Sequence, residues 1–468
     1  MKKLLMTIGI AAISGMSFAQ NNLDALSFSR TNPVLGTARY SGMAGAFNAL
    51  GGNPSAIKDN PAALGVYRSM DLTFTPSLYI NNDGEVKAAL DNFAFVLNFG
   101  SKKNKHGYVT SSLGINYNRL NNISRYTRCR GERIPFSVTD DFYDFAPDNI
   151  YEFAQDLQLI DGEGVSNFAG GVNDVVRSYT LMEKGHVGQW DIAYGLNISN
   201  TLYVGAAFGF TTLDYKQTAM YDEETLPTDV YEHWSLDNIY EAEGHGFNFR
   251  FGAICRPIDE IRIGASFETP TYYDIVDYQR VEMSTENRPT VFDDFGGDFS
   301  YALRTPLKFK TGVGFVIGKK AMIGLDYQYE NFKKIRMKVK DINIESEADL
   351  AEEQMNKTHT VKLGAEVQVA DGFFLRAGTA ISSSPMKNYD RDIAECTSNF
   401  RIITIPQNSF YVTGGAGYKG EHFYCDLAYV FQNQKDFLYP NMPLSPKDDP
   451  VEENLKTRNI IASFGWRF

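Results

Sequence analysis

The sequence has little cysteine, little proline and few charged residues. Its 468 residues include 4 Cys and 17 Pro, and 22% are Asp, Glu, Lys or Arg. The cysteine count argues against a disulfide-stapled fold, and the proline count argues against a Pro-rich linker protein. Because 43% of the residues are apolar, the chain is also too apolar to be disordered.

Positive charge and catalytic motifs are lacking as well. The 45 Lys and Arg stand against 57 Asp and Glu, so we expect no nucleic-acid partner, which would require a basic surface. The sequence has no His-Glu-x-x-His, no Gly-x-Ser-x-Gly and no Gly-rich phosphate loop. The 6 histidines show no metal-ligand spacing. We therefore predict no enzyme, no metal site and no cofactor.

The first residues predict an export signal. Lys2 and Lys3 precede an apolar run over residues 4–16, and small residues follow at the two positions that a signal peptidase reads, the second being Ala19. We assign residues 1–19 to a signal peptide that is removed after Sec export. The apolar run is too short to span a bilayer, and no later run of about 18 apolar residues predicts a spanning helix.

From about residue 70 onward, bulky apolar residues alternate with Gly, small polar or charged residues. One example is the series Leu202, Val204, Ala206, Phe208 and Phe210. A period of two places each series on one face of a β-strand. A soluble sandwich would also alternate, but here the second face is rich in Gly and aromatic residues gather at the strand ends. This pattern favours a barrel in an outer membrane, whose strands turn an apolar face to lipid.

The windows of alternation predict about fourteen strands, a number that suits such a barrel. They lie at about 70–80, 92–100, 107–120, 188–199, 201–215, 245–255, 260–284, 299–317, 320–332, 358–369, 372–383, 408–418, 422–433 and 457–468. Long and short connections alternate between them, as expected for external loops and periplasmic turns.

The longest predicted loop, 121–187, holds an apolar series that predicts an amphipathic helix over the mouth. We expect a packed loop helix, and the alternative is a lid or ligand groove. The series is Ile150, Phe153, Ala154, Leu157, Leu159 and Ile160. Cys129 and Cys396 fall in external loops and are free to pair in an oxidising setting.

The end of the chain agrees with a barrel. Phe464, Trp466 and Phe468 share one face of the last predicted strand, and Phe468 is the final residue. A terminal strand ending in Phe resembles the assembly signal that the barrel-insertion machinery reads. We therefore expect outer-membrane lipid and the barrel-assembly machinery as partners.

Residues 20–69 do not alternate and are predicted to fold separately, as a plug inside the barrel. Asn60 is suited to cap a helical turn, Pro61 to occupy its first position and Gly65 to end it. The run over residues 38–64, and above all Asn60-Pro61-Ala62, resembles the hatch of the FadL/TodX-type outer-membrane transporters. A further resemblance lies in Thr305-Pro306-Leu307-Lys308-Phe309, at the opening of a predicted barrel strand.

That family passes long-chain fatty acids and other hydrophobic molecules inward by diffusion, without ATP, and releases them sideways through a gap in the barrel wall. The resemblance implies hatch or gate roles for Gly45, Phe47, Leu50, Asn60, Pro61 and Ala62. An acid ligand also requires a cation. The candidates on the lumen faces of the strands are Lys308, Lys310, Arg250, Lys362 and Arg376, and those in the hatch are Arg30, Arg39, Lys58 and Arg68. Carboxylates of the same phase compete for these cations, namely Asp191, Asp326, Glu366 and Asp426.

Together these features predict an all-β transmembrane antiparallel β-barrel of about fourteen strands over residues 70–468, with an N-terminal hatch over 20–69 that contains short helices. We expect a monomer in the outer membrane of a Gram-negative bacterium that takes up hydrophobic small molecules. The alternatives are a docking or assembly partner for surface proteins or a secretion system, haem uptake, and a surface hydrolase.

Overall fold

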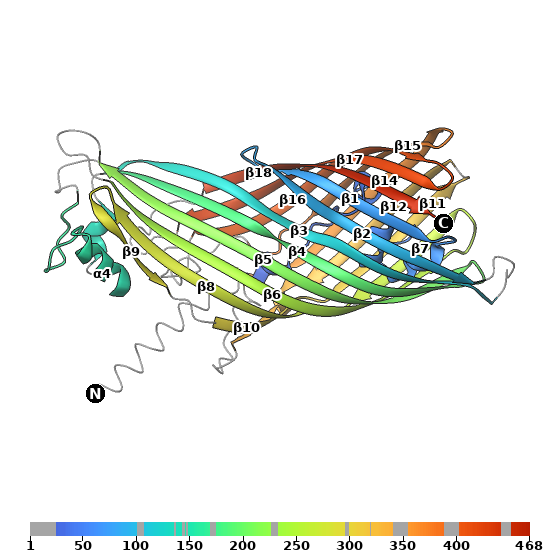
Figure 1. Ribbon diagram of the computed structural model, residues 1–468, viewed down its shortest axis with the longest axis horizontal. Coiled ribbons are helices and arrows are strands. Elements are labelled where there is room, and N and C mark those ends of the chain that lie inside the picture. Colours follow the sequence, from blue (N-terminus) through green and yellow to red (C-terminus); the bar gives the residue numbers. More distant parts are fainter. Residues whose placement is uncertain are drawn as a thin grey trace.

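The computed structural model describes residues 25–468 except 101–106, 135–136, 143–145, 147, 169–174, 226–232, 295–298, 319, 340–353, 388–401 and 441–450. The predicted signal peptide lies outside the described residues, as does Cys396. The chain forms a long antiparallel barrel that closes where its first strand pairs with its last (Figure 1). We call the end where Phe468 lies the turn end, and the end that carries the helix α4 the loop end.

The barrel has 14 strands, as predicted. We call each of these 14 barrel strands a stave, because some of them consist of two labelled elements. Eleven staves are single elements, and they are β1 (Asp71–Ile80), β2 (Val86–Gly100), β3 (Tyr108–Ile134), β4 (Val175–Ile198), β5 (Leu202–Thr225), β6 (His233–Cys255), β14 (Lys357–Ala370), β15 (Phe373–Ser382), β16 (Ile402–Lys419), β17 (Phe423–Pro440) and β18 (Val451–Arg467).

Three adjacent staves are each broken into two elements. They are β7 (Ile261–Glu268) with β8 (Tyr272–Thr285), β10 (Phe299–Arg304) with β11 (Lys308–Ile317), and β12 (Ala321–Asn331) with β13 (Arg336–Val339), the last pair joined by η5 (Phe332–Lys334). Pro270 and Pro306 lie in two of the breaks and cannot donate a ladder hydrogen bond. The breaks lie at one height, because Lys308 pairs with both Glu268 and Glu330. β9 (Arg288–Asp294) adds a short hairpin on β8.

Several strands run much further toward the loop end than predicted. β3 has 27 residues and β5 has 24, whereas a membrane-spanning strand needs about 9–11. Much of the predicted loop 121–187 is therefore strand, as are residues 216–225 and 233–244 of one further predicted loop and residues 434–440 and 451–456 of another. The prediction of short strands was wrong here because the apolar residues of these strands switch from the outer to the inner face along their length.

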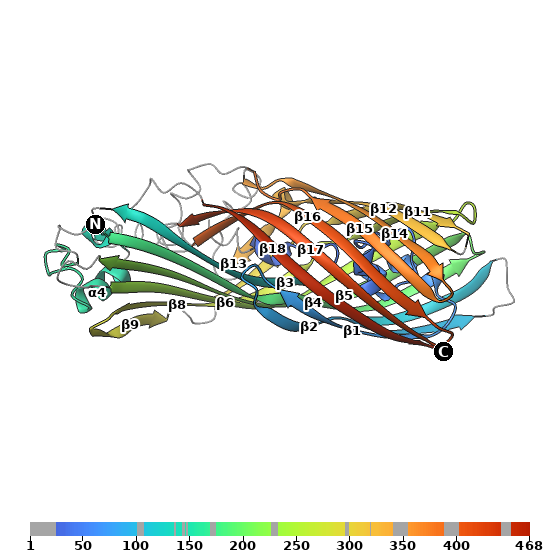
Figure 2. The ribbon, with the colours of Figure 1, turned by 90° about the horizontal axis from the view of Figure 1, so that it is seen from above.

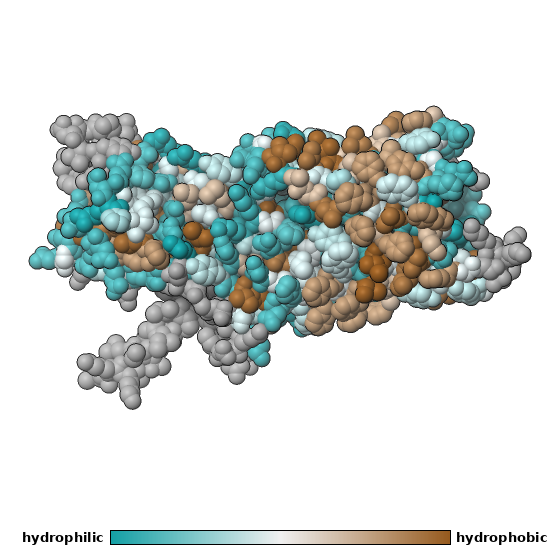
Figure 3. Space-filling view, viewed as in Figure 1, coloured by the Kyte–Doolittle hydropathy of each residue, from teal (hydrophilic) through white to brown (hydrophobic). Residues whose placement is uncertain are grey.

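An apolar belt surrounds the part of the barrel nearer the turn end. The space-filling view shows hydrophobic side chains gathered there and hydrophilic ones over the loop end (Figure 3). A row of aromatic residues bounds this belt, each opposite the next on neighbouring strands, from the half-buried Tyr117 through the exposed Trp190, Phe210 and Phe247 to Tyr272. Such a row is typical of a lipid–water boundary. Within the described residues, no helix is long and apolar enough to cross a membrane.

Residues 25–70, here called the plug, lie inside the barrel (Figure 2). The plug contains α2 (Ala38–Gly42), η1 (Pro54–Lys58) and η2 (Pro61–Val66). Its backbone lies directly on glycines of the barrel wall. A Cβ added at Gly378 would lie 2.7 Å from the Ala44 nitrogen, and one at Gly205 would lie 2.5 Å from the Pro61 carbonyl carbon. The glycine-rich inner face thus makes room for the plug.

The loop end carries a separate apolar core. α4 (Asp148–Asp156) confirms the predicted helix, and with η3 (Val138–Asp141) it packs on the inner faces of the tall strands. At its centre the buried Glu223 accepts hydrogen bonds from the indole of Trp234 at 3.1 Å and the backbone nitrogen of Val138 at 3.0 Å, and it pairs with Arg177 at 3.0 Å.

A seam lies in the wall between β2 and β3. The ladder between β2 and β3 ends at the pair Asn92–Asn118, and the rest of β2 toward the loop end pairs with β1. Side chains bridge the seam instead, because Lys87 Nζ donates to Ser124 Oγ at 2.9 Å. Asp91 and Asn92 both point inward and are fully buried, since the register shifts by one residue at this point.

Candidate ligand path in the barrel lumen

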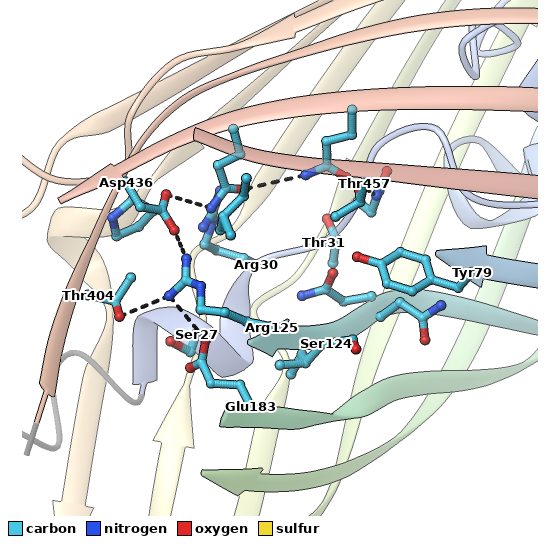
Figure 4. Close-up of a pocket in the computed structure, with 18 of the residues that line it drawn as sticks. Ser27, Arg30, Thr31, Tyr79, Ser124, Arg125, Glu183, Thr404, Asp436 and Thr457 are labelled. Carbon is cyan, nitrogen blue, oxygen red and sulfur yellow. Dashed lines mark hydrogen bonds and ion pairs between the residues drawn. The ribbon is translucent and has the colours of Figure 1, made fainter. Parts of the chain in front are cut away.

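A polar pocket of about 130 Å³ opens between the plug and the strands on the loop side (Figure 4). Amide and hydroxyl side chains form much of its lining, and Ser27 and Arg30 of the plug form part of its floor. Arg30 Nη2 donates to Gln434 Oε1 at 3.2 Å, and Asn32 Nδ2 donates to Gln432 Oε1 at 3.1 Å. The pocket therefore suits a group that accepts and donates hydrogen bonds.

One wall of the polar pocket is an ion-pair network around Arg125. Its guanidinium pairs with Asp436, lies 3.1 Å from Glu183 Oε2 and donates to Thr404 Oγ1 at 2.9 Å. These residues come from β3, β4, β16 and β17, so the network ties strands that are far apart along the wall. The charge of Arg125 is balanced within the protein.

An apolar cluster adjoins the polar pocket on the other side of the same plug segment. The long strands β5 and β6 and the broken staves supply its side chains, including Tyr215, Tyr240, Tyr273, Ile275, Tyr301 and Leu303. Leu26 and Phe28, in a helical turn over residues 25–29, fill its centre and are each 1% exposed. The plug turn is thus amphipathic, with Ser27 and Arg30 on the polar side.

Beneath both features lies a buried charge cluster around Asp59 of the plug. Its carboxylate accepts from the hydroxyl of Tyr40, and it lies 2.8 Å from Lys310 Nζ and 3.4 Å from Lys362 Nζ. Burial alone would raise the pKa of Asp59, but the ammonium groups around it outweigh burial and hold the pKa far below its usual range. The carboxylate therefore stays ionised and fixes two wall lysines to the plug.

Lys58 also belongs to this cluster, and burial there disfavours its charged form. It is 5% exposed and donates from Nζ to the carbonyl of Leu35. Burial lowers its pKa to about 7, because the attraction of Asp59 is opposed by Lys362 and Lys310. Lys58 therefore titrates near neutral pH.

A small cavity of about 20 Å³ separates this cluster from the wall cations Arg250 and Lys308. Arg250 pairs with Asp191, and Lys308 lies 3.6 Å from Glu268 Oε1. The Nε and Nη1 atoms of Arg250 are buried without a hydrogen-bond partner among the described residues. Two donor nitrogens of Arg250 thus remain unpaired among the described residues that surround the cavity.

On the turn side of the plug a second network joins plug and wall. Glu366 receives Arg39 at 2.7 Å and Arg376 at 2.6 Å, and Arg376 also reaches Asp426 at 2.7 Å. These groups line a cavity of about 180 Å³. The competing carboxylates proposed from the sequence thus pair with Arg250 and Arg376, whereas Asp326 Oδ2 accepts from the backbone of Asn48 at 2.8 Å.

Comparison with known proteins identifies the fold. No family model and no curated protein matches the sequence. Among solved structures, the CymD monoaromatic hydrocarbon channel is 12% identical with a TM-score of 0.54, covering 94% of this chain and 98% of that one. A Pseudomonas aeruginosa FadL homologue is also 12% identical with a TM-score of 0.54, covering 94% and 99%. The Ralstonia pickettii toluene transporter TbuX is 12% identical with a TM-score of 0.51, covering 93% and 99%.

The chain has the FadL-type channel fold. Within this fold, Asn60 caps η2, accepting from Ala62 N at 3.0 Å through Oδ1, with Pro61 at the first position. Its Nδ2 also donates to the carbonyls of Asn48 at 2.8 Å and Ala253 at 3.2 Å. Asn60 thus ties two parts of the plug to the wall. η2 continues past Gly65 to Val66, so the prediction that Gly65 ends the turn was wrong.

The other predicted hatch residues are buried as well. Phe47 stacks on Tyr40 with ring centroids 5.7 Å apart. Leu50 faces Gly314, where an added Cβ would lie 2.6 Å from its Cδ2. Gly45 has φ +73°, and a side chain there would collide with the carbonyl of Pro33. Leu50 therefore seats the plug against the barrel wall, whereas the cited contacts of Phe47 and Gly45 lie within the plug.

The remaining predicted residues lie away from the pockets. Arg68 reaches Asn200 Oδ1 at 2.8 Å, at the turn end. Phe464, Trp466 and Phe468 are exposed at 39%, 43% and 71%, and Trp466 contacts Phe423 with ring centroids 5.5 Å apart. Phe464 and Trp466 therefore face outward in the apolar belt, and their role as an assembly signal stays a prediction.

Sequence reasoning missed Arg125, Asp436 and the apolar cluster. Arg125 lay in a predicted loop, and its partner Asp436 lies about three hundred residues further along the chain. The signal that was available is the series Leu213, Tyr215 and Ala219, which alternates in the opposite phase to the apolar belt.

Proposed function

We propose that the chain is an outer-membrane channel for the passive uptake of hydrophobic small molecules, long-chain fatty acids among them. The observation that carries this proposal is a closed barrel whose lumen is filled by its own plug, with a polar pocket, an apolar cluster and buried cations above the seal. An apolar solute gains about 25 cal/mol for each Å² that it buries in such a lumen. A channel of this kind needs no ATP.

We assign the carboxylate of an acid ligand to Arg250, Lys308 and Lys310. Support comes from the small cavity that they line and from the two donor nitrogens of Arg250, Nε and Nη1, that have no partner among the described residues. Lys362 and Arg376 are the weaker candidates of the five, because Asp59 neutralises the first and two carboxylates neutralise the second.

We assign the exit of the apolar solute to the seam between β2 and β3. The seam begins one residue beyond Tyr117 of the aromatic row, so a solute that leaves sideways there emerges at the edge of the apolar belt. The side-chain hydrogen bonds that bridge the seam, such as the one between Lys87 and Ser124, break more easily than a β-ladder.

Uptake by proteoliposomes tests the proposal. The full chain is reconstituted, and the entry of labelled oleate is measured with and without a disulfide across the seam, made from Leu90→Cys and Arg119→Cys in a background without the native cysteines. The matched control joins Leu78→Cys and Ala88→Cys, which are paired in an intact ladder. We expect the seam disulfide to slow uptake at least about tenfold and the control to leave it unchanged. No uptake by the wild type would refute the channel function.

A docking role is the second candidate. The tall strands carry α4 and its own apolar core well beyond the apolar belt, which gives the loop end a folded surface of its own. Removal of residues 137–168 should abolish docking and spare uptake if both functions exist.

A further inference from the structure

The lining of the polar pocket is unlike that of an ordinary site for a hydrophobic ligand. Such sites are lined mostly by hydrophobic and aromatic side chains, with a few polar groups that fix orientation. Here most of the lining side chains are polar, and they come from the plug and from several strands around it (Figure 4). The amides and hydroxyls include Ser27, Asn32, Asn121, Asn122, Thr404, Gln432, Gln434 and Thr457. The part of a ligand that lies in this pocket must therefore form many hydrogen bonds.

Several of these polar groups have hydrogen-bonding capacity left for a ligand. Among the described residues, the side chains of Ser27 and Asn121 form no hydrogen bond and no ion pair. Asn122 uses its Oδ1, which accepts from Arg119 Nη1 at 2.7 Å, and its Nδ2 has no acceptor in the described part of the chain. Amides and hydroxyls both donate and accept hydrogen bonds. Their natural partners are hydroxyl groups, which do the same.

The charges around the polar pocket disfavour a charged ligand group. Arg125 lies 3.1 Å from Glu183 and 3.8 Å from Glu453, and it also pairs with Asp436. Together with Arg30 on the floor, these side chains carry two positive and three negative charges, so the sum is −1. A carboxylate would be repelled by the carboxylates of this wall, and a cation would be repelled by Arg30. An uncharged group avoids both repulsions.

Apolar side chains border the polar pocket on the side of the apolar cluster. Ile123, Pro406 and Leu455 belong to its lining, and Ile123 also packs against the apolar cluster. A hydroxylated head can therefore lie among the amides while an acyl chain attached to it follows an apolar surface. The pocket and its border thus match the two halves of an amphiphile.

We propose that the polar pocket binds an uncharged group that carries several hydroxyls, such as the glycerol head of a monoacylglycerol. The inference rests on the proposed uptake function, because it adds a second class of substrate to the acid ligands whose carboxylate we assign to Arg250, Lys308 and Lys310. Free glycerol presents the same hydroxyl chemistry without an acyl chain, and titration separates these two sources.

Binding of labelled 1-oleoylglycerol to the full-length protein in nanodiscs tests the proposal, with empty nanodiscs as the reference for partitioning. The variant that combines Ser27→Ala with Asn121→Leu loses no hydrogen bond of the described structure. We expect its Kd for 1-oleoylglycerol to be about tenfold higher than that of the wild type, or about 1.4 kcal/mol, and its Kd for oleate to be unchanged. The matched control is Asn287→Leu, in the exposed turn before β9, which should bind both lipids like the wild type.

Two results would overturn the proposal. Equal Kd values of the double variant and the wild type for 1-oleoylglycerol would show that the polar pocket does not hold the glycerol head. A tenfold rise in the Kd for oleate as well would show that the pocket takes a charged head. Competition by free glycerol identifies the source of the hydroxyls: displacement of 1-oleoylglycerol supports binding of the free polyol, and its absence supports binding of the ester alone.

A further measurement uses the wild type alone and does not depend on the folding of a variant. Methyl oleate has the same acyl chain and no hydroxyl, so the wild type should bind 1-oleoylglycerol at least about tenfold more tightly, after correction for partitioning. Equal affinities would overturn the site, and the proposed channel function would stand if oleate still entered proteoliposomes. Conversely, tight binding of 1-oleoylglycerol without uptake of either lipid would reject the channel function and keep the site.

Discussion

A buried lysine that titrates near neutral pH is the most unusual single residue of the plug. Lys58 is charged in the unfolded chain up to about pH 10, whereas burial lowers its pKa to about 7 in the folded protein. Between these two values the unfolded state binds more protons than the folded state. The free energy of unfolding therefore rises with pH across this window and no longer changes through Lys58 below about pH 7.

Replacement of Lys58 by Met should remove this dependence. The variant keeps the length of the side chain and loses its charge, so its stability should change less between pH 7 and pH 9.5 than that of the wild type. The difference should be on the order of a few kcal/mol. Thermal unfolding of both proteins in the same detergent, followed across this pH range, measures it. An identical pH slope in the two proteins would show that Lys58 keeps its ordinary pKa.

Some residue roles could be read from the sequence and others required the fold. The capping of η2 by Asn60 and the first position of Pro61 follow from local backbone chemistry, and both predictions agree with the structure. The bonds from Asn60 to Asn48 and Ala253 span up to 193 residues, and no local pattern encodes them. The same holds for Gly65, which lies against the carbonyl of Leu196, where an added Cβ would be 2.5 Å away.

At the scale of the element, the inner faces of the strands are shaped for the plug. Gly378 of β15 lies against Ala44, whereas the nearest atom to a Cβ added at Gly414 of β16 is 3.9 Å away. Gly378→Ala should therefore destabilise the plugged barrel by about 1–3 kcal/mol through overpacking, and Gly414→Ala should cost far less. The midpoint of thermal unfolding compares the two variants. Equal effects would mean that the plug can shift at little cost in stability to accommodate a methyl group at Gly378.

The lengths of the strands illustrate why a regular pattern can still mislead. Along β5, Phe208 and Phe210 face outward within the apolar belt, but beyond Thr212 the apolar residues Leu213 and Tyr215 face inward. Beyond the aromatic row the outer face turns polar, and the inner face builds the apolar cluster. The period of two continues while its phase shifts by one residue, which looks in the sequence like the end of a strand.

At the scale of the whole molecule, the barrel was predictable and its seam was not. Strand number, closure and apolar belt all follow from an alternation that repeats along the chain and from the aromatic residues at strand ends. The seam depends on one extra residue, Asp91, and on a ladder that stops at Asn92. Pro270 and Pro306 account for two of the three broken staves, but that all three breaks lie at one height depends on the register of the neighbouring strands.

The seal of the barrel belongs to the molecule as a whole, because wall glycines, Asp59 and Glu366 all hold the plug in place. Deletion of residues 20–69, with residues 1–19 retained, should leave a folded barrel with a polar, glycine-lined lumen that conducts ions. Planar-bilayer recordings should show open steps for the deletion variant and none for the full chain, and cells that express the variant should become sensitive to large hydrophilic antibiotics. Heat-modifiable migration on gels controls for folding. A folded deletion variant that remained closed would show that the loop end, rather than the plug, seals the lumen.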